Sequence, residues 1–114
     1  MKCMMVSRID DEKAIEYTGK LGDALSRAGI DVEFETATAH GLHRQGSTFS
    51  KSRPDMAVIV GGDGTILRTV QAMDRQVPVI GINWGEVGFL ADLEPEEAEG
   101  VLTTISDGFL VESR

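Results

Sequence analysis

An apolar run that ends in a glycine-rich turn constrains the fold of this chain more than any other stretch. Residues 56–60, MAVIV, are all apolar, and a run this short and rich in β-branched residues is typical of a strand buried on both faces. The turn GGDG follows at 61–64, and beyond it Ile66, Leu67, Val70 and Met73 recur at helical spacing. Strand, turn and helix in this order predict the edge of an open α/β sheet at which ligands bind, where backbone N–H groups and the helix dipole favour phosphate.

The rest of the chain alternates in the same way between strand and helix patterns. We predict strands over residues 2–6, 30–36 and 77–83, helices over 11–28, 65–73 and 94–105, and the start of another extended segment at 109–111. Asp10 or Asp11 can cap the first helix, and Gly29 can end it. This alternation predicts an α/β fold with a mainly parallel sheet and right-handed crossovers.

The strands and connections are expected to differ in burial. Residues 30–36 alternate apolar and acidic side chains, which indicates a half-exposed strand near a sheet edge, whereas 77–83 are expected to form another buried strand. Residues 37–54 have no period and are rich in Gly, Ser, Thr, His and Arg, so we expect a long loop with room for one helical turn. Its basic residues are expected to be solvated, although they could meet phosphates.

Composition and charge exclude several functional classes. The length of 114 residues fits one domain, and the formal net charge of -8 argues against a nucleic-acid-binding surface. Cys3 is the only cysteine, so an internal disulfide and a cysteine-rich zinc site are excluded. His40 and His43 have no organised ligand partners in sequence, and we assign no residue to a metal. The N-terminus carries no long apolar run, so we expect no signal peptide, no membrane span and a cytoplasmic protein.

The carboxylate within the glycine turn points to a particular chemistry. GGDGT has neither the glycine spacing of the dinucleotide-binding fingerprint nor the Gly-Lys-Ser/Thr ending of the nucleoside-triphosphate loop. Asp63 would repel a phosphate, but it could orient a hydroxyl that attacks a phosphoryl group and accept its proton. Thr65 offers a hydroxyl and a backbone N–H, and Arg68 can reach an anionic group. The alternative is that Asp63 only caps the helix, and the full five-residue motif after a buried strand favours the chemical role.

The glycines of the turn are expected to serve the ligand. Gly61, Gly62 and Gly64 lack side chains, so the backbone can approach a bound molecule closely, and glycine also tolerates positive φ. The predicted binding set is Gly61, Gly62, Asp63, Gly64, Thr65, Arg68, Asn83 and Phe89.

Two motifs together resemble one enzyme family. GGDGT at 61–65 resembles the signature of NAD kinases and of the wider superfamily that contains diacylglycerol and sphingosine kinases. GINWGEVGFL at 81–90 is similar to the NAD kinase pattern Gly-x-Asn-x-Gly-x-x-Gly-Phe-Leu, and the distance between the motifs also fits. The resemblance implies that residues 1–114 are the N-terminal α/β domain of a two-domain kinase. It further implies a Rossmann-like, mainly parallel sheet with helices on both faces, and a β-rich C-terminal domain that lies outside this chain.

The resemblance also implies a reaction and roles for individual residues. The expected activity is transfer of a phosphoryl group from ATP or polyphosphate to the 2′-hydroxyl of the adenosine ribose of NAD, which gives NADP. Asp63 matches the proposed general base, Asp63 and Gly64 match nucleotide contacts, and Arg68 matches a nucleotide-binding basic position. Phe89 matches an aromatic residue beside the adenine and can equally be a core residue. Asn83 can contact ligand or tie the second loop together.

The implied partners are NAD, a phosphoryl donor, the C-terminal domain and further copies of the protein. Mg²⁺ or another divalent cation is expected with the donor phosphates. The isolated chain is expected to be inactive. Two alternatives stay open: a lipid or other small-molecule kinase that shares GGDGT, and a non-catalytic nucleotide-binding module. The lack of an apolar membrane-facing element disfavours a lipid substrate. Trp84 stands at a variable position of the second motif and is expected to pack or to form an interface.

Overall fold

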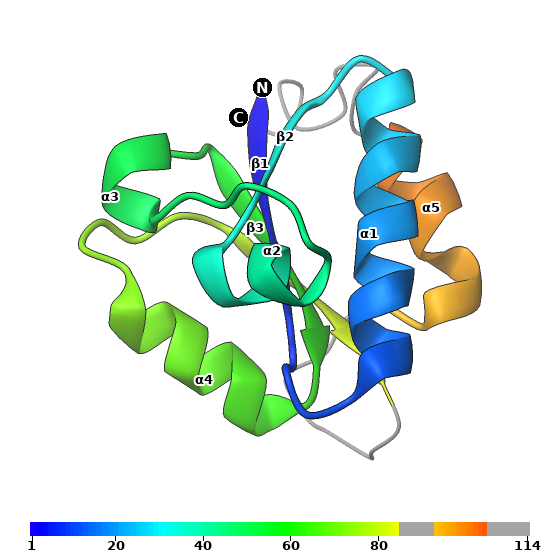
Figure 1. The fold of residues 1–114 in the computed structure, drawn as a ribbon. Helices are drawn as coiled ribbons and strands as arrows, with labels where there is room; N and C mark the ends of the chain where they lie inside the picture. The colour runs from blue at the N-terminus through cyan, green and yellow to red at the C-terminus, as the bar shows by residue number, and fades with distance from the viewer. Residues whose placement is uncertain (85–92, 105–114) are drawn as a thin grey trace.

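A four-stranded parallel sheet forms the centre of the molecule. The computed structural model describes residues 1–84 and 93–104, and Figure 1 draws the remaining residues in grey. The strands run in the order β2-β1-β3-β4, and all three neighbouring pairs are parallel. Their bounds are β1 Lys2–Ser7, β2 Asp31–Phe34, β3 Met56–Gly61 and β4 Val79–Asn83. The predicted α/β fold with a parallel sheet is confirmed.

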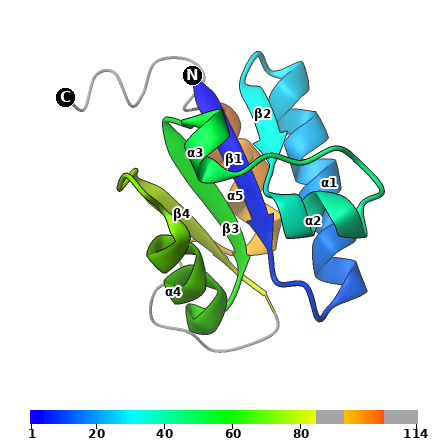
Figure 2. The same ribbon diagram turned by 60° about the vertical axis from the view of Figure 1, so that its left-hand side comes forward.

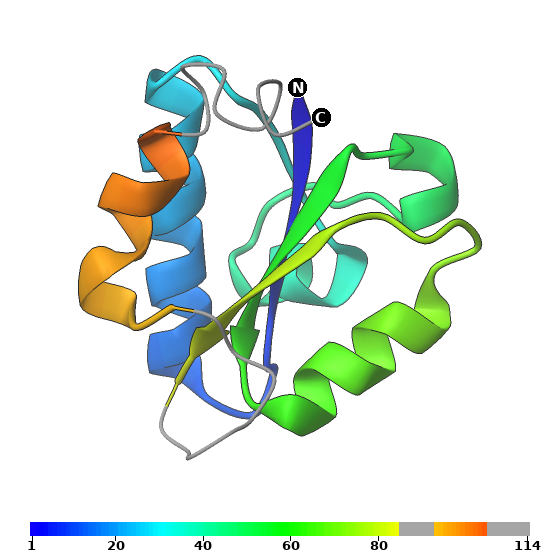
Figure 3. The same cartoon turned by 180° about the vertical axis from the view of Figure 1, so that it is seen from behind.

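Helices cover both faces of this sheet. The helices are α1 Glu12–Arg27, α2 Thr36–Gly41, α3 Phe49–Ser52, α4 Asp63–Ala72 and α5 Pro95–Thr104. α1 packs on β1 and β2 and contacts α5, and Figure 3 shows these two helices side by side. α4 packs on β3, and Figure 2 shows α3 in front of the sheet and α5 behind it. The expected Rossmann-like arrangement, with helices on both faces, is confirmed.

The burial of the central strand β3 on both faces explains why its sequence is an unbroken apolar run. Met56, Val58 and Val60 point into the core cluster beneath α1 and α5, whereas Ala57 and Ile59 point into the cluster beneath α3 and α4. Each of these five side chains is at most 2% exposed. Because side chains of a strand alternate between the two faces, a strand covered on both sides has no position for a polar residue.

The first helix begins and ends where the sequence predicts. The Asp11 side chain accepts hydrogen bonds from the backbone N–H groups of Lys13 (2.9 Å) and Ala14 (3.2 Å), so Asp11 is the N-cap. Gly29 follows the C-cap residue Ala28 with a φ of +98°, a conformation that favours glycine. The edge position predicted for residues 30–36 is also confirmed, since β2 is the outermost strand on its side.

The connection over residues 37–54 was predicted as a loop with one helical turn, and this prediction is wrong. The structure has two short helices there, α2 and α3. The Glu35 side chain accepts a hydrogen bond from the N–H of Thr38, and the Thr48 side chain accepts one from the N–H of Lys51. Helices of one or two turns form around such local caps and are too short to produce a hydrophobic period.

Three burial predictions are also corrected. β4 is an edge strand of the described sheet, and its Val79 and Ile80 are only half-buried. Leu67 is 53% exposed, and Thr69 takes the buried position on α4, where its hydroxyl donates to the carbonyl of Thr65 (2.8 Å). Val101 on α5 is 42% exposed, although Ala98 and Leu102 are buried as predicted. Ile105 and the extended segment predicted at 109–111 lie outside the described residues.

No helix within residues 1–84 and 93–104 has the length and apolar character needed to cross a membrane.

Candidate functional site

The site lies where the carboxyl ends of β1 and β3 meet. The chain passes from β1 through α1 to β2 on one side, and from β3 through α4 to β4 on the other. Ser7 pairs with Val60, and the backbone N–H of Arg8 donates to the carbonyl of Val60 (2.9 Å). The loops that follow the two strands therefore diverge around a topological switch point, which is where open α/β sheets bind ligands.

A cavity of about 400 Å³ occupies this switch point. It is lined by Arg8, Ile9, Asp10, Gly62, Gly64, Thr65 and Arg68. Four residues of the predicted binding set, Gly62, Gly64, Thr65 and Arg68, thus share one cavity with the loop that follows β1. Arg68 also lines a neighbouring cavity of about 230 Å³, together with Glu35 and Thr48.

Asp63 is the first residue of α4, two residues before the predicted start of this helix at Thr65. Its neighbours Gly62 and Gly64 both line the cavity, and Asp63 itself is half-buried. Gly62, with φ -109° and ψ -167°, occupies the N-cap position. Asp63 is therefore not the capping residue that the alternative interpretation requires. Its carboxylate belongs to the first helical turn, where the helix dipole favours negative charge.

The glycines of the turn have two different reasons to lack a side chain. A Cβ at Gly61 would lie 2.7 Å from Oγ1 of Thr65 and 2.9 Å from its Cβ, so the packing of strand against helix excludes a larger residue. A Cβ at Gly64 would meet no protein atom within 4 Å. The expected use of positive φ is not observed, because Gly29 is the only described glycine with that conformation. Of Gly61 and Gly64, only Gly61 has its small size explained by the packing of the chain.

Asn83 ties the end of β4 to the segment that leads into α5. Its position in the ladder is opposite Gly61, next to the turn. The Asn83 side chain donates to Oε2 of Glu94 (3.3 Å), and its backbone N–H donates to the carbonyl of Leu93 (2.8 Å). Its Oδ1 is buried and has no hydrogen-bond partner among residues 1–84 and 93–104. These bonds favour the tying role expected for Asn83. Phe89 lies outside the described residues.

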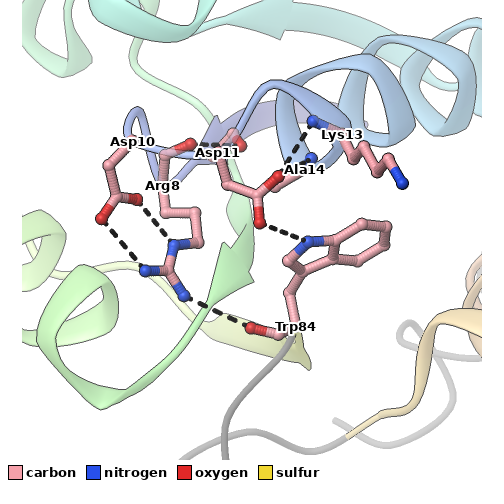
Figure 4. Close-up of polar contacts among 7 residues, drawn as sticks. Arg8, Asp10, Asp11, Lys13, Ala14 and Trp84 are labelled. Carbon is pink, nitrogen blue, oxygen red and sulfur yellow. Dashed lines mark hydrogen bonds and ion pairs between the residues drawn. The ribbon is translucent and has the colours of Figure 1, made fainter.

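The loop after β1 carries a network that sequence reasoning missed (Figure 4). Nε and Nη2 of Arg8 donate to the two carboxylate oxygens of Asp10 at 2.7 and 3.0 Å, and Nη1 donates to the carbonyl of Trp84 (3.5 Å). The Arg8 guanidinium lowers the pKa of the Asp10 carboxyl. The position of Arg8 at the carboxyl end of a strand could have identified it, once β1 was predicted to lie beside β3.

Trp84 connects this loop to β4. Its indole N–H donates to Oδ2 of Asp11 at 3.2 Å (Figure 4). Its ring packs on that of Tyr17, with the ring centroids 5.1 Å apart. Asp11 thus caps α1 with one oxygen and holds Trp84 with the other. The packing role predicted for Trp84 is confirmed.

Arg44 is one of the basic residues of the segment 37–54, and it lies away from the cavity at the switch point. Arg44 forms two hydrogen bonds of 2.9 Å with the carboxylate of Asp23 and lies 5.0 Å from the centroid of the Phe34 ring, so it belongs to a surface contact. Within residues 1–84 and 93–104, no group of three or more His, Cys, Asp or Glu side chains could hold a metal ion.

The chain matches known proteins in sequence over almost its full length. The family described as the ATP-NAD kinase N-terminal domain matches residues 3–109. An NAD kinase of Methanoregula boonei is 53% identical over 114 residues, which are 100% of this chain and 42% of that relative. The chain therefore spans less than half the length of the curated relatives it matches.

Solved structures agree with the fold. The NAD kinase from Archaeoglobus fulgidus in complex with ATP aligns with a TM-score of 0.69 and 31% identity, over 96% of this chain and 38% of that one. Yeast NADH kinase complexed with NADH aligns with a TM-score of 0.79 and 20% identity, over 94% and 38%. At 20% identity, the yeast enzyme is evidence for the fold alone.

Proposed function

The chain belongs to the NAD kinase family, as its N-terminal domain, and from this premise we propose that the whole protein phosphorylates NAD. The reaction transfers a phosphoryl group from ATP or polyphosphate to the 2′-hydroxyl of the adenosine ribose and gives NADP. The relative from Archaeoglobus fulgidus was solved with ATP, which supports a nucleotide donor. We predict that the whole protein is cytoplasmic and that it forms a homo-oligomer.

The observation that carries this proposal is the placement of the GGDGT turn. The turn begins α4 at the switch point, and Gly62, Gly64, Thr65 and Arg68 line its cavity. Asp63 stands between two cavity-lining glycines, and in the proposed mechanism it orients the ribose hydroxyl and accepts its proton. A carboxylate suits this task because it accepts the hydrogen bond of the ribose hydroxyl and can take its proton.

The other residues of the turn have binding roles in this mechanism. Gly64 leaves open space beside the backbone, so a nucleotide can approach the helix N-terminus closely. Thr65 and Arg68 line the cavity. In this mechanism Thr65 donates a hydrogen bond to the nucleotide, and Arg68 neutralises an anionic group. Asn83 acts through its bonds to Glu94 and Leu93, which fix the end of β4.

Phosphoryl transfer ordinarily requires Mg²⁺ to neutralise the phosphates. The described residues hold no carboxylate and histidine cluster that would form a cation site of its own. We therefore expect the cation to arrive on the donor phosphates, as Mg²⁺ keeps most of its waters and takes few protein ligands.

The test is product formation by the whole protein. Incubation with NAD, Mg²⁺ and either ATP or polyphosphate is expected to yield NADP, identified by its 2′-phosphate. Parallel reactions with diacylglycerol and with sphingosine in place of NAD test the lipid-kinase alternative. Absence of NADP with both donors would contradict the proposal, and phosphorylation of a lipid alone would replace it.

A further inference from the structure

The Arg8–Asp10 ion pair lies on the wall of the cavity that faces α4. Both residues line the cavity, and the side chains of Arg8 and Asp10 are 22% and 69% exposed. An ion pair this exposed contributes little to stability. Its two short hydrogen bonds do fix the guanidinium, because a bidentate carboxylate restricts a long flexible side chain to one orientation.

The charges of the cavity lining favour a role for this arginine in binding an anionic ligand. The charged side chains of the lining are the guanidinium groups of Arg8 and Arg68 and the carboxylate of Asp10. Asp63 is not itself a lining residue, but it stands in the chain between two of them, Gly62 and Gly64. Without Arg8, the lining would hold one guanidinium and one carboxylate in a chain with a net charge of -8, and no net positive charge would attract a nucleotide phosphate.

We propose that Arg8, held in place by Asp10, binds a phosphate group of a nucleotide jointly with Arg68 on the opposite wall. This inference rests on the proposed kinase function, since it assigns a further binding residue to the same site. Guanidinium groups suit the task because their planar array of N–H donors matches the oxygens of a phosphate. Asp10 is then a positioning residue that acts through Arg8.

A matched control separates this role from the loss of any surface ion pair. Arg8→Gln removes a guanidinium that is bidentate with an exposed aspartate at the cavity. Arg44→Gln removes a guanidinium that is also bidentate with an exposed aspartate, Asp23. Neither Arg44 nor Asp23 lines the cavity. Both substitutions change the net charge equally, so long-range electrostatics affects the two variants alike.

The phosphate can belong to NAD or to the donor, and two arms distinguish these sources. Calorimetry on the whole protein measures the binding of NAD alone and of ATP alone, and steady-state kinetics measures KM for each. We expect Arg8→Gln to weaken binding of one nucleotide about tenfold, with a matching rise in its KM and a smaller change in kcat. The nucleotide affected is the one whose phosphate Arg8 binds.

Conservative variants test the positioning role of Asp10. Arg8→Lys keeps the positive charge without the planar fork and is expected to recover part of the lost affinity. Asp10→Asn keeps the size of the side chain, weakens its hold on the guanidinium, and is expected to raise the same KM by less than Arg8→Gln does.

The outcomes separate this inference from the proposed function. Unchanged binding of both nucleotides by Arg8→Gln, or an equal loss in Arg44→Gln, overturns the role of Arg8. Nucleotide binding that depends on Arg8 in a protein that forms no NADP supports the role and contradicts the kinase function alone. A wild-type protein that binds neither nucleotide overturns both.

Discussion

At the scale of single residues, Gly61 and Gly64 illustrate how one motif combines structural and functional constraints. Gly61 has no room for a side chain because Thr65 packs against it, whereas Gly64 faces open space. The sequence alone cannot separate these cases, since both positions are simply glycine in GGDGT. The distinction depends on how the strand and the helix meet, which is a tertiary property.

Gly64→Ala tests whether the open space at this glycine serves a ligand. Alanine favours helices by up to about 1 kcal/mol over glycine, so the variant is expected to be at least as stable as the wild type in thermal unfolding. We expect nucleotide binding to weaken nonetheless, because the new methyl group occupies the approach to the backbone. Normal nucleotide binding by a stable Gly64→Ala protein would show that this glycine does not serve the ligand.

Arg68→Ala tests the second cationic group of the cavity. The side chain is exposed on α4 and lines the site. If it binds an anionic group of a nucleotide equally in the ground state and the transition state, the substitution raises KM for that nucleotide, the same one that Arg8→Gln affects, with a smaller effect on kcat. Arg75→Ala provides a control, because Arg75 donates to the carbonyl of Pro54 and does not line this cavity. A change in kcat alone would contradict the binding role of Arg68.

At the scale of helices and strands, agreement between sequence and structure follows the length and burial of each element. β3 is an unbroken apolar run and α1 is a long helix with one consistent period, so their patterns predict them within one or two residues. α2 and α3 depend on the caps Glu35 and Thr48 and have no period to detect. The edge position of β4 depends on the strand order, because an apolar run cannot reveal whether a neighbour lies on both sides.

The site residues that the sequence predicts are those that lie close together in the chain. Asp63, Gly64 and Arg68 follow one strand within eight residues and form a continuous motif. Arg8 and Asp10 join them only because β1 lies parallel to β3, and this pairing connects residues more than fifty positions apart. No local pattern carries that information.

The Asp11 side chain links two elements, and its removal is expected to destabilise both. Asp11→Ala loses the N-cap of α1, worth about 1 kcal/mol, and the acceptor for the indole N–H of Trp84, worth about 1 kcal/mol more. Asp11→Asn retains a capping oxygen and is expected to lose roughly half as much. Urea unfolding of residues 1–114, followed by the fluorescence of their only tryptophan, Trp84, measures the loss of stability in both variants. Equal stability of the wild type and Asp11→Ala would contradict this bridging role.

At the scale of the whole molecule, residues 1–114 are expected to fold alone but not to make NADP. Two apolar clusters cover the two faces of the sheet, which is the arrangement of an independent α/β domain. Cys3 is 1% exposed, and burial raises the pKa of its thiol to about 12. We therefore expect thiol reagents to modify Cys3 slowly in buffer and rapidly in denaturant. Rapid modification in buffer would contradict independent folding.

The expected inactivity of residues 1–114 has a geometric reason. A general base works only when the hydroxyl is held within hydrogen-bond reach. Residues 1–114 cover 42% of a relative that is an NAD kinase, so we expect some of the residues that hold the ribose in place to lie outside them. A coupled assay is expected to detect no NADP. NADP formed by purified residues 1–114, and lost in Asp63→Asn, would show that this domain alone holds a complete site.

The catalytic role of Asp63 is tested by the rate of the chemical step in Asp63→Asn of the whole protein. Asparagine has nearly the same size and cannot accept the ribose proton as a base. With NAD and donor both saturating, single-turnover formation of NADP is expected to slow by about 100- to 10,000-fold, while NAD binding stays close to that of the wild type. A near-normal rate would contradict the account and leave Asp63 with a structural role at the start of α4.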